Sequence, residues 1–273
     1  MKASVRKTSS TVRETGNNVA GHNVAGNKVA LVTGSAKRLG KEMALRLAEA
    51  GYFTWVHYLS SRREAEAVLV AIKARGGDGG LVKGDMASPL DIRAMAAKIK
   101  AQSGRLDVLV NNVGIYRTES LLDYSVDDFE STLQTNLIGA FHLTQRCLPL
   151  FPKQGGSIVN IGYAGLENLT ASVHNTAYLI SKTGLYILTK SLAQALGSRA
   201  IRVNMVSPGI LDNSVELPKR PKDQVPLGRL GTCGDICDAV EFLVSNRASY
   251  VTGVNLDVAG GYMLKLSGLE SGS

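Results

Sequence analysis

The feature that most constrains the fold is a regular alternation of short apolar runs with amphipathic stretches, which begins at residue 28. An apolar run at 28–34 precedes a helical pattern that ends on Gly51, and a second run at 53–58 precedes one that ends on Gly76. Further apolar runs follow at 81–85, 106–112, 156–162, 200–209 and 251–261. Short buried strands that alternate with helices predict a parallel sheet with right-handed crossovers. We therefore expect an α/β fold with a single doubly wound parallel sheet and helices on both faces.

This alternation is not interrupted by any change in composition, so it predicts one domain at 28–265. Residues 1–27 carry no helix or strand periodicity and are expected to form a disordered or dispensable tail, with a short C-terminal tail at 266–273. The first tail is basic and rich in hydroxyl side chains, which leaves an organelle transit peptide as an alternative.

Composition narrows the class of partner. The three cysteines form no CxxC pair, which favours a reduced, cytoplasmic location and argues against a metal site. The apolar runs are far shorter than a membrane span, and no basic run with interleaved aromatic residues suggests nucleic acid. The net charge of +8 suits a phosphorylated cofactor or an anionic substrate instead. We expect a small-molecule substrate.

The segment TGSAKRLG, directly after the first predicted strand, has the pattern of a phosphate-binding loop. Gly34 allows a tight turn where a side chain would block a pyrophosphate, and Gly40 lets the following helix approach the sheet. The helix N-terminus then offers free N–H groups and a positive dipole end. The segment therefore indicates a Rossmann-type dinucleotide site. The residues expected to contact the cofactor here are Gly34, Lys37, Arg38, Leu39 and Gly40.

The end of the second predicted strand decides which cofactor is favoured. An NAD enzyme would carry Asp or Glu here to bind the ribose 2′-hydroxyl. This chain has no carboxylate until Glu64, and guanidinium and hydroxyl groups stand in its place. These groups and Arg38 favour NADP(H), although a solvated basic helix start would give the same pattern. The expected contacts at this strand end are His57, Tyr58, Ser60 and Ser61.

Tyr178 and Lys182 stand four residues apart at the start of a long apolar helix, and therefore lie on one face of it. A nearby positive charge favours the phenolate and lowers a tyrosine's pKa. The pair is therefore a candidate general acid/base unit.

With these pieces in place, the sequence resembles the short-chain dehydrogenase/reductase family over residues 28 to 264. The resemblance rests on motifs that fall in the family's order. They are the glycine loop, Asp85, NNVG at 111–114, Asn136, YLISK at 178–182, SPG at 207–209 and the closing VTGVNLDVAGGY.

The resemblance implies roles for several of these residues. Tyr178 would donate the proton, Lys182 would bind the nicotinamide ribose and lower the tyrosine pKa, and Asn136 would hold a water in a proton relay. Family members usually form dimers or tetramers through the helices that carry Asn136 and Tyr178, which implies a homodimer or homotetramer. The implied further cofactor contacts are Asp85, Met86, Asn112, Val113, Gly114, Pro208 and Gly209.

The chain departs from the family pattern at one position expected to contact the substrate. The family has a serine just after the fifth strand, and here Gly162 and Tyr163 stand at that place. Tyr163 could supply the missing hydroxyl as a catalytic residue or could only form the pocket wall, and Ser172 and Thr170 are weaker substitutes. A positioned donor of this kind typically contributes about 10²–10³ in rate, so its loss does not abolish the chemistry.

Within the family, the KRLG loop and the His57-Tyr58 strand end look like those of pteridine and dihydromonapterin reductases. Tyr116 could stack on a flat heterocycle, or it could be an ordinary wall residue. We expect NADPH-dependent reduction of a C=O or C=N group, in a pteridine-like substrate on this reading. The alternatives are a 3-oxoacyl-thioester or general carbonyl reductase, and a cofactor-binding sensor with little turnover. The charged segment 210–232 is expected to form the substrate lid.

Overall fold

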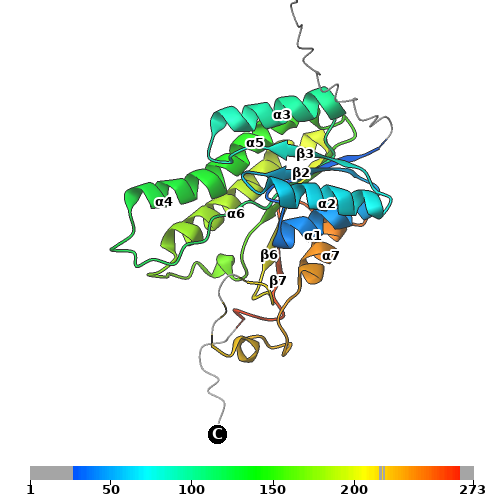
Figure 1. The fold of residues 1–273 in the computed structure, drawn as a ribbon. Helices are drawn as coiled ribbons and strands as arrows, with labels where there is room; N and C mark the ends of the chain where they lie inside the picture. Colours follow the sequence, from blue (N-terminus) through cyan, green and yellow to red (C-terminus); the bar gives the residue numbers. More distant parts are fainter. Residues whose placement is uncertain (1–26, 215–216, 218, 265–273) are drawn as a thin grey trace, which may run out of the picture.

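The computed structural model describes residues 27–214, 217 and 219–264 (Figure 1). Its core is a seven-stranded sheet, parallel throughout, with strand order β3-β2-β1-β4-β5-β6-β7. The strands are β1 (Val29–Val32), β2 (Phe53–Tyr58), β3 (Gly79–Lys83), β4 (Val108–Asn111), β5 (Gly156–Ile161), β6 (Ile201–Pro208) and β7 (Asn255–Val258). Each lies within or close to an apolar run predicted to be a strand, so the expected α/β fold is confirmed.

Helices cover both faces of this sheet (Figure 1). On one face lie α1 (Arg38–Glu49), α2 (Arg62–Ala74) and α7 (Cys233–Val244), whose apolar side chains share one core cluster with the sheet. On the other lie α3 (Pro89–Ser103), α5 (Gly139–Cys147) and α6 (Thr176–Leu196), which share a second cluster. All four residues of β1 are buried, as expected for a strand covered on both sides.

The strand order reverses at β1, because β2 and β4 flank it on opposite sides. In open α/β sheets, ligands bind beyond the carboxyl ends of the strands at such a switch point. The loops after β1, β4, β5 and β6 meet at that edge, and they carry most of the predicted site residues.

The helix starts differ in how they are capped. Ser88, Ser125 and Thr232 accept hydrogen bonds from the third helical N–H of α3, α4 (Val126–Leu133) and α7. Lys37 before α1 and Asn175 before α6 make no such side-chain bond. Free N–H groups at a helix start need another partner, and both of these starts lie at the switch-point edge.

The predicted tails and lid are only partly described. Residue 27 is the only described part of the tail predicted at 1–27, and 266–273 lies outside the described residues. The segment 210–232 is described apart from 215, 216 and 218, and it contains a short helical turn at Pro221–Gln224. In the described part of the chain, no helix combines the length and the apolar character needed to cross a membrane.

Candidate active site

A cavity of about 790 Å³ opens at the carboxyl ends of the strands. Arg38 and Leu39 line one end of it, and Tyr178 and Lys182 line the other. Segments from the glycine loop, β4, β5, α6 and β6 thus meet around one space. Its other lining residues include Asn112, Gly114, Tyr116, Tyr163, Thr170, Ser172, Asn175, Pro208, Gly209, Leu217, Tyr262 and Met263. The cavity therefore brings together the two predicted halves of the site.

The glycine loop is shaped by backbone contacts that no larger residue would allow. A Cβ added to Gly40 would lie 2.2 Å from the carbonyl oxygen of Gly34, and Gly34 itself has a φ of +64°. Asn112 fixes the same turn, because its Nδ2 donates to the carbonyl of Thr33 at 2.8 Å. The first turn of α1 holds no acidic residue. Its free N–H groups and positive dipole end therefore suit a pyrophosphate.

The basic side chains around this loop differ in how free they are. Lys37 is paired with Glu64 at 2.8 Å, so the first carboxylate after β2 neutralises part of the positive charge. Arg38 and Arg63 have no carboxylate within 4.0 Å in the described part of the chain. Ser60 is exposed, and Tyr58 and Ser61 are half-buried at the end of β2. These groups lie where a 2′-phosphate is expected.

His57 is placed differently from the sequence expectation. Its ring is 1% exposed and lies beneath the glycine loop. Gly34 N–H donates to its Nδ1 at 2.8 Å, and its Nε2 lies 3.0 Å from the carbonyl of Gly84. Burial lowers the pKa of His57 to about 4, so the ring is neutral at physiological pH. Both nitrogens are already engaged by backbone, and His57 therefore supports the loop instead of contacting the cofactor.

Asp85 and Met86 lie in the loop after β3. Asp85 accepts the N–H of Ala87 at 2.8 Å, and the buried Met86 packs into the core below it. After β4, the N–H groups of Asn112 and Val113 both donate to Oγ1 of Thr33, which was not among the predicted site residues. These bonds hold the two loops side by side.

Asn136 lies in a single π-turn, Gln134–Ile138, between α4 and α5. Such π-turns occur frequently at functional sites. Its Oδ1 accepts the N–H of Ile115 at 2.7 Å, and its Nδ2 donates to the carbonyl of Ile115 and to Ser181, each at 3.0 Å. Asn136 therefore fixes the loop that carries Tyr116 against α6. Sequence reasoning missed Ser181, which lies between the two catalytic candidates.

Lys182 is buried, with 3% of its surface exposed, and its Nζ donates to the carbonyl of Ile161 at 2.7 Å. Burial lowers the pKa of Lys182 to about 8. Gly114 faces the same ammonium, since a Cβ there would lie 3.2 Å from Nζ. The ammonium group is thus held at the centre of the cavity, 5.8 Å from the centre of the Tyr178 ring.

The pKa of Tyr178 corrects a sequence expectation. Burial raises it well above its ordinary value, and the neighbouring Tyr116 and Tyr163 raise it further. Tyr178 is therefore protonated and suited to donate a proton, but the predicted lowering of its pKa is wrong for this structure.

Two more tyrosines surround Tyr178. Tyr116 meets its ring edge-on, with centroids 5.0 Å apart, and is 41% exposed. Tyr163 lies 5.8 Å away at a tilt of 45°. Burial raises the pKa of Tyr163, and a hydrogen bond with Thr183 of α6 partly offsets this. Tyr163 therefore lines the wall of the cavity beside Tyr178.

Gly162, one of the two residues at the place of the family serine, has no room for a side chain. A Cβ there would lie 2.4 Å from Oγ of Ser207 and 2.7 Å from Sδ of Met205. Gly209 also has no space for a side chain, because an added Cβ would lie 2.7 Å from Cα of Ala259. Pro208 and Gly209 therefore form a flat backbone wall facing Tyr178 and Lys182.

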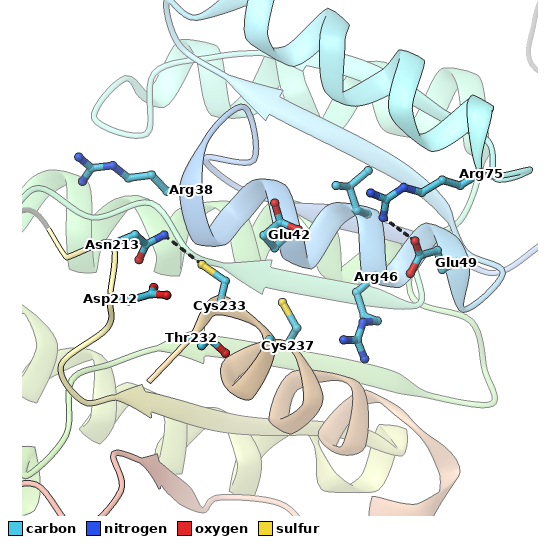
Figure 2. A pocket seen from close by; sticks show the side chains of 12 residues that line it. Arg38, Glu42, Arg46, Glu49, Arg75, Asp212, Asn213, Thr232, Cys233 and Cys237 are labelled. Carbon is cyan, nitrogen blue, oxygen red and sulfur yellow. Dashed lines mark hydrogen bonds and ion pairs between the residues drawn. The ribbon is translucent and has the colours of Figure 1, made fainter. Parts of the chain in front are cut away.

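A second hollow, of about 630 Å³, lies between α1 and α7 (Figure 2). Arg38 and Asn213 line both this hollow and the main cavity. Asn213 donates through Nδ2 to Sγ of Cys233 at 3.1 Å, which ties the first part of the predicted lid to α7 (Figure 2). The described residues include no group of three or more His, Cys, Asp or Glu side chains that could hold a metal ion.

Comparison with known proteins identifies the family. A family model described as enoyl-(acyl carrier protein) reductase, of the short-chain dehydrogenase type, matches residues 34–263. The chain belongs to the short-chain dehydrogenase/reductase family. The 3-oxoacyl-(acyl-carrier-protein) reductase of Staphylococcus aureus is 38% identical over 244 residues, which are 86% of this chain and 97% of that protein. The resemblance inferred from the ordered motifs is thereby confirmed at the level of the family.

Solved structures agree with this assignment. A landomycin C-6 ketoreductase with bound NADP and rabelomycin is 31% identical, with a TM-score of 0.80 over 87% of this chain and 97% of that one. An acetoin dehydrogenase from Enterobacter cloacae is 33% identical, with a TM-score of 0.81 over 89% of this chain and 99% of that one. This short-chain dehydrogenase/reductase is therefore an NAD(P)-dependent oxidoreductase of the carbonyl-reductase type.

Proposed function

We propose that the protein is an NADPH-dependent reductase of a small-molecule ketone. The observation that carries the proposal is the continuity of the main cavity, which runs from a basic glycine loop to Tyr178 and Lys182. The residues present fit the cofactor, because a Cβ at Gly34 or Gly40 would fill the loop and α1 begins without an acidic residue. When bound, NADPH would supply a hydride to the carbonyl carbon.

The chain's own residues would handle the proton. Tyr178 holds its proton because burial raises its pKa, and its ring lines the cavity, so it can donate to the developing alkoxide. Lys182 would stabilise the phenolate left behind, since its ammonium lies close to that ring in a buried setting where charge interactions are strong. Asn136 would keep the loop of Tyr116 in place, and the proton relay inferred from the family stays a prediction.

Preference for NADP(H) over NAD(H) is part of this proposal. It is supported by the absence of an acidic residue at the end of β2 and by Arg38 and Arg63, which have no carboxylate partner among the described residues. The landomycin ketoreductase, which resembles this chain, contains bound NADP. The adenine-side and nicotinamide-side contacts predicted from the family motifs remain predictions.

The names of the relatives point to a ketone instead of a pterin. By their names, the relatives described above are a 3-oxoacyl-(acyl-carrier-protein) reductase, a landomycin C-6 ketoreductase and an acetoin dehydrogenase. The exposed Tyr116 ring still offers a surface for a flat heterocycle, so a pterin remains a second candidate.

The test is NADPH oxidation by the purified enzyme with four substrate classes: small and cyclic ketones, an acetoacetyl thioester, and dihydrobiopterin. Turnover of ketones or the thioester supports the proposal, and turnover of dihydrobiopterin alone replaces it with the pterin reading. Tyr178→Phe should remove turnover and leave NADPH affinity intact. NADPH binding without turnover on any substrate would contradict the proposal.

We also propose that the chain pairs through α5 and α6. Ile138, directly before α5, Phe141 on α5, and Ile180 and Ile187 on α6 expose 38–61% of their surface. Exposed apolar side chains gathered on neighbouring helices favour a symmetric contact between copies. Light scattering should give the mass of a dimer or tetramer, and Ile187→Glu should reduce it to that of the monomer.

A further inference from the structure

A third hollow, of about 610 Å³, adjoins the main cavity, and we call it the lid hollow. Thr170, Tyr262 and Met263 line both spaces, so the two meet along these residues. The lid hollow has three further lining residues, which do not line the main cavity: Asn168, Gln224 and Leu264. A molecule bound at Tyr178 in the main cavity therefore has a second space into which it can extend.

The walls of the lid hollow come from three segments that are distant in the sequence. One follows β5, one belongs to the predicted lid, and one follows β7. The lid wall is fixed in place, because Leu227 N–H donates to the carbonyl of Gly260 at 3.0 Å. Gly261 lies against Pro226, since an added Cβ there would lie 2.8 Å from Cγ of the proline. The hollow is therefore enclosed by segments that are held together by close backbone contacts.

Backbone strain gathers where the two spaces meet. Five described residues other than glycine have a positive φ, and two of them are Leu169 at +50° and Met263 at +70°. Leu169 lies between Asn168 and Thr170, and Asn168 donates through Nδ2 to the carbonyl of Met263 at 3.5 Å. Strained residues of this kind cost free energy and persist where the surrounding structure requires them, often at ligand sites. Their place beside both spaces favours a role in binding.

The lining of the lid hollow is uncharged. Asn168 and Gln224 bring amide groups, and Thr170 brings a hydroxyl group. Met263 and Leu264 add apolar surface, and no charged residue of the described chain lines the hollow. An ionic group would gain no charged partner there, whereas methylene groups would be buried and a neutral polar group would be hydrogen-bonded.

We infer that the lid hollow is a distal subsite, which binds the tail of a substrate whose ketone reacts at Tyr178. The inference rests on the proposed ketone reduction. The main cavity must hold both the nicotinamide end of the cofactor and the ketone, so a tail that extends past Thr170 and Met263 enters the lid hollow. The substrate class is therefore an elongated, uncharged ketone whose tail carries an amide or hydroxyl group. Binding of such a remote tail raises kcat/KM, because its energy also stabilises the transition state.

The experiment compares three 3-oxoamides with the same reacting ketone: acetoacetamide, N-pentylacetoacetamide and N-(2-acetamidoethyl)acetoacetamide. The two tails have the same length, and only the last one carries a second amide. Wild type should reduce both tailed compounds with a kcat/KM about 10-fold or more above that of acetoacetamide. The amide tail should exceed the pentyl tail by about threefold, the scale of one net hydrogen bond.

Gln224→Trp fills the lid hollow from the lid side and should remove most of the gain from either tail. Asp223→Trp is the matched control, because Asp223 is the exposed neighbour of Gln224 in the same turn and lines neither space. It should keep the gain. Asn168→Ala, on the wall that follows β5, should remove only the preference for the amide tail.

NADPH affinity, measured by fluorescence for every variant, shows whether the cofactor site has folded. Equal kcat/KM for the three compounds in wild type, or an undiminished gain in Gln224→Trp, would overturn the inference. Absence of turnover of acetoacetamide and of the small and cyclic ketones by wild type would instead overturn the proposed function.

Discussion

Gly34 donates its backbone N–H to Nδ1 of His57 at 2.8 Å, so the turn of the phosphate loop is held by a buried imidazole. Nδ1 accepts only if the ring's proton is on Nε2, and Nε2 then donates to the carbonyl of Gly84. One neutral ring thus joins the loops after β1 and β3. A charged ring would lose the bond from Gly34.

This arrangement makes stability depend on pH. Burial lowers the pKa of His57 to about 4 in the folded chain, against 6.5 when unfolded. The contribution of His57 to the free energy of unfolding is complete above pH 6.5. It is lost as the pH falls toward 4, because the His57 ring of the unfolded chain binds a proton at a higher pH than that of the folded chain. We expect the free energy of unfolding to fall by about 2 kcal/mol between pH 7.5 and 5 from this residue. Urea unfolding of wild type and His57→Asn checks it: the variant should be less stable at pH 7.5, and an equally steep fall in both proteins would contradict the assignment.

Glu64→Gln should strengthen NADPH binding. Glu64 pairs with Lys37 at 2.8 Å beside the expected 2′-phosphate site, so removal of its charge frees a cation there. An exposed pair of this kind contributes little, and we expect the Kd for NADPH to fall by about two- to fivefold, with little change for NADH. Glu66→Gln is the control, because Glu66 also lies on α2 and pairs with Arg62, which lies one turn before it. An equal gain for both cofactors would contradict the prediction.

Gly40→Ala should weaken both stability and cofactor binding. The added Cβ would lie 2.2 Å from the carbonyl oxygen of Gly34, so the backbone of the loop must move. We expect a loss of about 1–3 kcal/mol, as for other overpacked sites, and a clear loss of NADPH affinity. Gly197→Ala is the control, because no atom lies within 4 Å of its added Cβ and its φ of −57° suits alanine. Thermal unfolding and fluorescence titration with NADPH measure both effects.

The rate of ketone reduction should fall as the pH rises through about 8. Burial lowers the pKa of Lys182 to about 8, and above that pH the amine loses the charge that stabilises the Tyr178 phenolate. The raised pKa of Tyr178 keeps its proton in place over the same range. Lys182→Met should therefore be slow, by about 10²-fold or more, and should lack this limb of the pH profile. A profile of unchanged shape in the variant would assign the limb to another group.

Gly162→Ser, which places a hydroxyl directly after β5, should not improve the enzyme. Its Cβ would collide with Oγ of Ser207, whose hydroxyl donates to Asn255 at 2.6 Å. We expect lower stability, by about 1–3 kcal/mol, and no gain in kcat. The double variant Gly162→Ser/Ser207→Gly removes the colliding atom and should recover part of the stability. Equal stability of the single variant and wild type would show that the strand shifts more easily than this packing indicates.

The sequence by itself determined the fold and indicated the main parts of the candidate site. Strand runs, helix periodicity and the glycines at 34 and 40 are local patterns, since each is set by backbone sterics and by burial of one face. The spacing of Tyr178 and Lys182 also carries its own geometry, because residues four apart on a helix share a face. The structure therefore contains these features where the sequence patterns predicted them.

Only the tertiary structure decided how several of these residues act. His57 turned out to be a buried support because Gly34 and Gly84, far apart in sequence, close over its ring. The direction of the Tyr178 pKa depends on Tyr116 and Tyr163, which come from two other loops. The buried Oδ1 of Asn175, which has no hydrogen-bond partner in the described structure, is found only once its neighbours are in place. Burial and pairing are properties of contacts between distant segments, and a local pattern does not contain them.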